Sequence, residues 1–180
     1  MLGLEQAPTA TPAVDVTITP DQPTQQAPPF ATPFLDAAPG SSRENPVPSG
    51  SSIDVDDMTI SINRTIRPAD EIVASANPFN PTPQLDNEYL MMSVTLTCNK
   101  DSDDVCSIYL SRLTVVGSTG IRREPEVMIA GLPNLLSTQE FFGGAQLDGD
   151  IIFEVGQGES DLLVVYEALF GDSVYIALPG

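Results

Sequence analysis

The sequence contains no histidine and no tryptophan. Without histidine, the Ser-His-Asp and Cys-His catalytic arrangements and the usual zinc ligand sets are excluded. A glycine-rich phosphate loop is also missing, since Gly156 and Gly158 are followed by no third glycine. Carboxylates are numerous, but no spacing singles out a pair that could serve as the acid and base of a glycosidase. These absences predict a protein that is not an enzyme and needs no cofactor.

Long apolar runs are absent as well. No stretch reaches the roughly 20 apolar residues of a membrane-spanning helix, so we expect no membrane span in this chain. The chain does not open with a basic region followed by an apolar one, as a secretory signal does. If the protein is exported, we expect its signal or anchor to lie outside this sequence.

Basic residues are scarce: 7 Lys and Arg stand against 25 Asp and Glu, which gives a formal net charge of −18 at pH 7. The first 50 residues hold 5 acidic residues and 1 basic residue, which leaves 20 and 6 for the rest. Such a surface repels phosphate backbones and anionic lipid, so nucleic acid is not an expected partner. We interpret the acidity mainly as a feature that favours solubility.

Proline is concentrated at the start, where residues 1–50 hold 10 of the 17 prolines among Thr, Ser, Gln and Ala. Proline blocks helices and strand ladders, and this composition favours extended, semi-rigid spacers. We therefore predict a Pro/Thr/Ser-rich extended stalk or linker over residues 1–50 and one folded domain over residues 51–180. The apolar residues that interrupt the stalk, by chance or as contacts with a partner, are Val14, Val16, Ile18, Phe30 and Phe34.

After residue 50 the sequence changes to short apolar runs that alternate with polar residues and are separated by turn residues. The strongest strand signal places five apolar residues on one face: Leu90, Met92, Val94, Leu96 and Cys98. About seven such runs predict an all-β fold, either a sandwich or a barrel.

Three places break the pattern of alternation. The parity of the apolar positions changes at Asp56 and Asp57, where we expect a β-bulge. Residues 67–87 are polar and rich in proline, which predicts a long loop. Residues 126–139 fit either a short strand or one helical turn.

The two cysteines, Cys98 and Cys106, enclose a short segment between two apolar runs. If those runs form a β-hairpin, the cysteines face each other across its mouth within bridging distance. The loop-entropy model gives such a disulfide roughly 2–3 kcal/mol, and the bond implies an oxidising compartment. The alternative is two unrelated buried thiols; we favour the disulfide.

The segment between the cysteines carries Asp101, Asp103 and Asp104 close to Asn99. Calcium prefers several oxygen ligands, so this loop is a candidate calcium site. The glycine that an EF-hand needs at its sixth position is missing, and Asp also favours ordinary solvated turns. Two further acidic clusters allow the same two interpretations: Asp54, Asp56 and Asp57, and Asp148 with Asp150.

Four stretches of the second part carry a resemblance: residues 88–96 (EYLMMSVTL), 144–155 (GAQLDGDIIFEV), 162–166 (LLVVY) and 174–178 (VYIAL). They resemble a family of bacterial secreted and lipoprotein-borne domains of unknown function that have an immunoglobulin-like, telokin-like β-sandwich. The resemblance covers roughly residues 51–179 and includes Asn99 after the central strand, whereas the cysteine pair departs from the family pattern. It implies an immunoglobulin-like β-sandwich of about seven strands in an extracytoplasmic, often lipid-anchored protein, and implies no agreed ligand.

Together these patterns predict a non-enzymatic, extracytoplasmic protein-interaction module, secreted or associated with the cell surface or envelope and presented on a stalk. Its expected partner is another protein or a surface component. One alternative is a structural subunit of a cell-envelope or extracellular assembly, in which the N-terminal segment docks on neighbouring copies or other subunits. Another is an adhesion-type domain that calcium stabilises.

Overall fold

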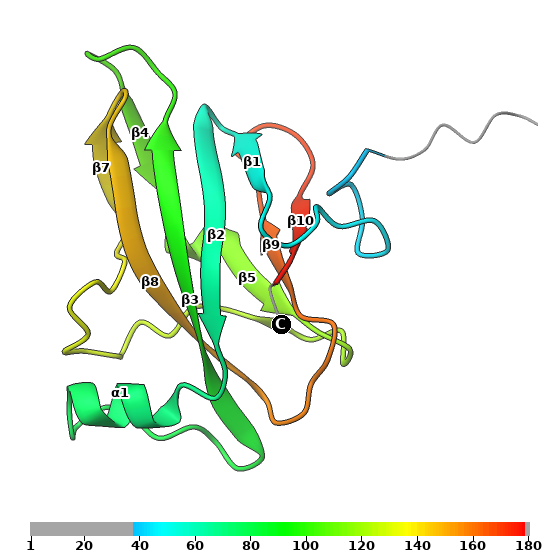
Figure 1. Ribbon diagram of the computed structural model, residues 1–180, viewed down its shortest axis with the longest axis vertical. Coiled ribbons are helices and arrows are strands. Elements are labelled where there is room, and N and C mark those ends of the chain that lie inside the picture. The colour runs from blue at the N-terminus through cyan, green and yellow to red at the C-terminus, as the bar shows by residue number, and fades with distance from the viewer. Residues whose placement is uncertain (1–37, 179–180) are drawn as a thin grey trace, which may run out of the picture. The chain divides into compact units, whose positions relative to one another are not determined.

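The computed structural model describes residues 38–178, which form an all-β fold of antiparallel sheets with one short helix (Figure 1). The first sheet has the order β1-β2-β3-β8, with β1 (Ser52–Val55), β2 (Met58–Ile66), β3 (Asn87–Cys98) and β8 (Gln146–Gly156). The second sheet has the order β10-β9-β5-β6, with β10 (Val174–Ala177), β9 (Leu163–Tyr166), β5 (Leu113–Val116) and β6 (Arg122–Arg123). The remaining elements are the strand pair β4 (Val105–Ile108) and β7 (Gln139–Phe142), the helix α1 (Asp70–Ala76) and the 3-10 turn η1 (Leu110–Arg112).

The main core lies between the two sheets. On β3 the positions buried in this core are the ones that the alternation predicts, namely Leu90, Met92, Val94, Leu96 and Cys98. The second sheet contributes Leu113, Val115, Val164, Tyr166 and Ile176 to the same core. Because one face of each sheet is apolar and the two faces pack together, the predicted all-β sandwich is confirmed.

A second, smaller core lies on the outer face of the first sheet, under α1. There the sheet residues Tyr89, Met91 and Ile152 pack against Ala69, Val73 and Ile129. In Figure 1, α1 and the yellow-green segment before β7 lie at the same end of this sheet. The long loop predicted for residues 67–87 therefore contains a short helix, because its few apolar residues meet an apolar patch of the sheet.

The prediction of a β-bulge at Asp56 and Asp57 is wrong. These two residues form the turn of the β1–β2 hairpin, in which Val55 pairs with Met58. Their φ angles are 51° and 60°, and positive φ at both central residues is typical of a type I′ turn, whose twist matches that of the strands.

The two cysteine-containing runs also do not form the hairpin that the sequence suggested. β3 pairs with β2 on one side and β8 on the other, so neither of its edges is free for β4. β4 pairs with β7 instead. Residues 38–178 contain ten strands in place of about seven, since the turn at Asp56 and Asp57 divides one run into β1 and β2 and the short strands β6 and β7 carry no clear alternation.

Irregular segments cover two edges of the sandwich. Residues 40–47 run along β10, where the Val47 N–H donates to the Tyr175 carbonyl at 2.8 Å. The folded part thus begins before the boundary placed at residue 50. Residues 125–136, expected to form a strand or a helical turn, instead make isolated bridges to β8 through Pro125 and Leu135. In the described residues, no helix is long and apolar enough to cross a membrane.

Candidate functional site

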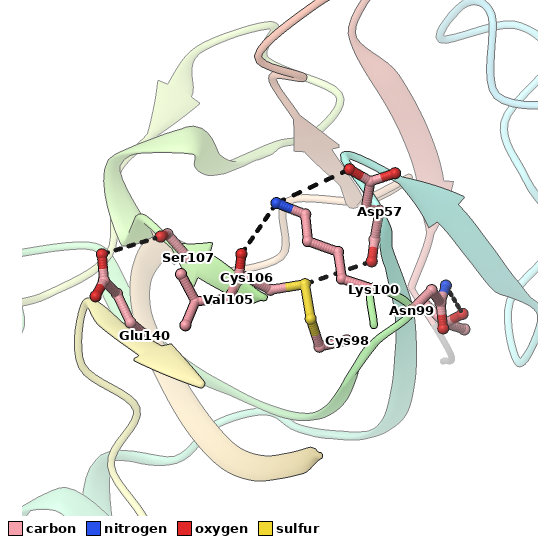
Figure 2. Close-up of a disulfide and its surroundings, with 9 residues drawn as sticks. Asp57, Cys98, Asn99, Lys100, Val105, Cys106, Ser107 and Glu140 are labelled. Carbon is pink, nitrogen blue, oxygen red and sulfur yellow. Dashed lines mark hydrogen bonds and ion pairs between the residues drawn. A yellow bond between two sulfur atoms is a disulfide. The ribbon is translucent and has the colours of Figure 1, made fainter. Parts of the chain in front are cut away.

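The disulfide joins the end of β3 to β4 and so links two different sheets (Figure 2). The Sγ atoms of Cys98 and Cys106 are bonded at 2.05 Å, and both residues are buried. The Cys106 sulfur lies 3.5 Å from the carbonyl oxygen of Asp57 in the β1–β2 turn. The bond is therefore part of the core, and it fixes both ends of the acidic loop.

The acidic loop between the cysteines is held by its backbone. The Asp104 N–H donates to the Asp101 carbonyl at 2.9 Å, and the Gly143 N–H donates to the Asp104 carbonyl at 2.9 Å. Figure 2 shows the Lys100 amine directed to the Val105 carbonyl, at 2.9 Å, and toward the Asp57 carboxylate. This lysine spans the base of the loop.

The candidate calcium ligands Asp101, Asp103 and Asp104 are all exposed on this loop. Nowhere in residues 38–178 does a group of three acidic, His or Cys side chains come close enough together to hold a metal ion. Of the other acidic positions, Asp148 and Asp150 accept hydrogen bonds from Thr95 and Ser93, each at 2.5 Å, across the polar outer face of the first sheet. These carboxylates serve to order that face.

Asp56 has a structural role that could not be inferred from the acidic cluster Asp54, Asp56 and Asp57. Its carboxylate accepts hydrogen bonds from the Tyr166 hydroxyl at 3.0 Å and from the Leu169 N–H at 2.8 Å. The Arg112 guanidinium lies 3.4 Å away. Burial, the nearby Asp56 charge and this hydrogen bond raise the pKa of Tyr166 to about 12. The β1–β2 turn is thus fastened to the connection between β9 and β10; we call this set of bonds the Asp56 latch.

A groove of about 1120 Å³ opens at the other end of the sandwich, where β2 ends and β9 begins. Its apolar lining comes from both sheets and from the residues just before β9 and just after β10: Ile66, Leu90, Leu162, Leu163, Ala177 and Leu178. Its charged lining consists of Arg43, Glu44, Arg67, Glu159 and Asp161. We call this hollow the end groove.

Two of the charged residues of the end groove are bound into its walls. Arg67 donates through Nε to the Glu88 carboxylate at 2.5 Å, through Nη2 to the Gly156 carbonyl at 2.6 Å, and through Nη1 to the Glu159 carbonyl. The Glu159 carboxylate is buried and accepts from the Thr119 hydroxyl. These bonds tie the end of β2 to the loop between β8 and β9.

The end groove is poorly suited to acid–base chemistry. Burial raises the pKa of Glu159, but hydrogen bonds from Thr119 and Gly156 and the charge of Arg123 outweigh burial and hold the pKa below its usual value. A general acid needs the opposite shift. The pKa of Glu126 is raised, by burial and by Glu154, but Glu126 does not line the groove. The arrangement fits binding better than proton transfer.

Sequence reasoning missed Arg67 and Glu159, because their partners lie about 20 to 90 residues away and no local spacing marks them. The only local signals were a charged residue beside Pro68 and one after the Gly158 turn. The predicted contact positions Val14, Val16, Ile18, Phe30 and Phe34 lie outside the described residues.

No protein-family model matches the sequence, and no curated protein sequence matches it. Several solved structures are similar to the fold. The yjhA protein from Bacillus subtilis has a TM-score of 0.54 and 12% identity, covering 74% of this chain and 99% of that chain. A provisionally assigned lipoprotein from the same organism, ycdA, has a TM-score of 0.55 and 14% identity, covering 73% and 39%. MPT63, a secreted protein from Mycobacterium tuberculosis, has a TM-score of 0.53 and 12% identity, covering 75% and 98%. The chain thus shares its β-sandwich fold with bacterial proteins, one of them secreted.

Proposed function

We propose that this chain is a non-enzymatic, extracytoplasmic interaction module whose β-sandwich receives a partner in the end groove. The observation that carries the proposal is the construction of that groove. Both sheets contribute apolar walls, and the side chains of Arg67 and Glu159 are engaged in bonds within those walls. A preformed concave surface of mixed polarity is typical of a binding site, and engaged ionisable groups are unsuited to turnover.

The extracytoplasmic location is supported by two findings. The disulfide between Cys98 and Cys106 is of a kind that persists in oxidising compartments. Among the proteins of similar fold, MPT63 is a secreted protein, and ycdA is provisionally assigned as a lipoprotein. The proposal also retains the immunoglobulin-like character inferred from the sequence, and a Pro-rich stalk over the first part of the chain.

The proposal is tested by obstructing the groove without disturbing its walls. Ser160 is exposed and lines the groove, its bonds to Ser118 are made by its backbone, and its side chain makes one exposed hydrogen bond, to the neighbouring Asp161. Ser160→Trp should place an indole in the groove while leaving the melting temperature unchanged. Ser49→Trp is the matched control, because Ser49 is exposed and lies outside the groove lining.

The measurement is chemical cross-linking of the full chain to the extracellular and envelope proteins of its native host. We expect one or a few cross-linked partners with the wild type and the Ser49→Trp control, and their loss with Ser160→Trp. Equal cross-linking by both variants would contradict the assignment of the end groove as the binding site. A native protein that sediments as a large self-assembly would favour the structural-subunit alternative.

A further inference from the structure

Two loops at the α1 end of the sandwich expose large apolar side chains. Phe79 is 91% exposed, Val127 is 77% exposed and Met128 is 75% exposed. Single exposed apolar residues are common on protein surfaces, whereas groups of them mark binding sites.

Asn80 joins the two loops. Its side-chain amide donates to the Val73 carbonyl at 2.8 Å and to the Ala130 carbonyl at 3.0 Å, and its side-chain oxygen accepts from the Ala130 N–H at 2.9 Å. Phe79 directly precedes Asn80, and Met128 lies two residues before Ala130. The Asn80 amide therefore ties together the two loops that carry the three exposed side chains. We call Phe79, Val127 and Met128 the apolar patch.

The loops that carry the apolar patch are rigid although they lack regular structure. Phe79 and Asn80 are flanked by Pro78 and Pro81, whose rings fix φ. The Tyr89 hydroxyl donates to the Pro81 carbonyl at 3.0 Å. Such pre-organisation lowers the entropy lost on binding, which favours a docking role over accidental exposure.

The second loop is pressed closely against α1. Gly131 has a φ of 83°, and a Cβ built there would lie 2.5 Å from the Ala76 carbonyl oxygen. Only glycine accepts both the backbone conformation and the close approach. The loop that carries Val127 and Met128 is therefore held after Met128 by the Asn80 amide and the contact at Gly131, and before Val127 by the Glu126 N–H, which donates to the Ile152 carbonyl at 2.8 Å.

The charge around the apolar patch is negative. Residues 69–87 and 124–138 contain no Lys or Arg, and they carry the exposed Glu71 as well as Glu124 and Glu126. A second copy would bring the same acidic border and a net charge of −18, and an anionic membrane would be repelled as well. A protein surface with an apolar cleft bordered by Lys or Arg complements both the shape and the charge of the patch.

We propose that the apolar patch is a docking surface for a protein whose apolar cleft is bordered by basic side chains. The inference rests on the proposed role as an interaction module, and it names a surface separate from the end groove. None of the three patch residues lines that groove.

The test uses the full chain, immobilised, and a phage-displayed library of random 12-residue peptides as the probe. Enriched peptides are synthesised and titrated against the wild type, Phe79→Ser, Met128→Ser and Phe170→Ser. Phe170 is the matched control because it is 92% exposed and follows Leu169, which bonds to the Asp56 turn at the opposite end of β2 from α1. All three substitutions remove exposed side chains, so the melting temperature should not change.

We expect enriched peptides to combine aromatic or aliphatic residues with Lys or Arg. Their Kd should rise about tenfold or more for Phe79→Ser and Met128→Ser and stay unchanged for Phe170→Ser. Enriched peptides that bind both patch variants as well as wild type would overturn the docking surface but leave the interaction module intact. A library that yields no enriched peptide would count against both.

Two further measurements test whether the apolar patch binds a membrane or a second copy of the chain instead of another protein. Flotation with vesicles of phosphatidylcholine and phosphatidylglycerol that depends on Phe79 would overturn the proposal in favour of a membrane. A dimer that appears at high protein concentration and is lost in Phe79→Ser would overturn it in favour of a second copy. With a protein partner, the wild-type chain stays monomeric and does not float.

Discussion

The Asp56 latch allows the most direct test of how the sandwich is held together, through the substitution Asp56→Ala. The change removes the acceptor of the buried Tyr166 hydroxyl and of the Leu169 N–H. Leaving a buried hydroxyl unpaired costs about 1–3 kcal/mol, and the second bond contributes about 1 kcal/mol. The Arg112 ion pair is longer, at 3.4 Å, and Arg112 keeps its bond to the Glu167 carbonyl when Asp56 is replaced, so nothing is added for it.

Asp57→Ala is the matched control, because Asp57 also has positive φ but its side chain is largely exposed, with only Lys100 at 4.0 Å. Alanine at either position costs about 1–2 kcal/mol of left-handed backbone strain. The difference between the two variants isolates the carboxylate. Urea titration should therefore show Asp56→Ala less stable than Asp57→Ala by about 2–4 kcal/mol. Equal losses would refute the latch, because the backbone term would then explain both.

The pH dependence gives an independent measure of the same contact. Tyr166 has a pKa raised to about 12, mainly by burial and next by the Asp56 charge, against an ordinary value of 10.0. Between these pH values the unfolded chain loses a proton that the folded chain keeps. The free energy of unfolding should fall as pH rises from 10 to 12, by up to about 2.7 kcal/mol. Tyr166→Phe should lack this component; an unaltered alkaline slope in that variant would contradict the assigned pKa.

Three further predictions concern other parts of the molecule. Replacing Cys98 and Cys106 by Ala should lower the free energy of unfolding by about 2.5 kcal/mol, as expected for a bond with a sequence separation of 8, and should abolish the effect of reductant on the melting temperature. Arg67→Ala should cost about 3 kcal/mol by leaving Glu88 without its ion pair, whereas the exposed Arg64→Ala should change stability by less than about 0.5 kcal/mol. Excess calcium and a chelator should give equal melting temperatures, since residues 38–178 contain no group of three acidic, His or Cys side chains close enough to hold a metal ion. A melting temperature that rises with calcium would contradict this and indicate a calcium site in the chain.

The strands could be predicted where one face of a strand is buried along its whole length. β3 is the clearest example, because its burial alternates from Met92 to Cys98 as the sequence indicates; before Met92 both faces are buried, since α1 covers the outer one. The turn at Asp56 and Asp57 could not be identified, since a two-residue hairpin places Val55 and Met58 on the same face and so produces the same change of parity as a bulge. Neither aspartate signals positive φ as strongly as an Asn-Gly pair does.

Strand pairing and the end groove lie beyond local sequence. The run that contains Cys106 could pair with β3 only if an edge of β3 were free, and the two strands that occupy those edges come from before and after it in the chain. Likewise, Arg67 meets Glu88 and the Gly156 carbonyl through separations of 21 and 89 residues. The spacing of apolar residues, every two in strands or every 3.6 in helices, does not encode such contacts, so the walls of the groove could not be predicted from the sequence.

The polar contacts of this domain point to a single physical strategy. Asp56 fastens loops at one end of the sandwich, and Arg67 and Asn80 fasten loops at the other, each through contacts that are distant in sequence. Irregular segments fixed in this way keep their surface in one conformation, which reduces the entropy cost of binding. The same bonds occupy the charged groups that a reaction would need free. A sandwich built like this suits the recognition proposed above at the end that Arg67 and Asn80 hold, where the end groove and the apolar patch both lie.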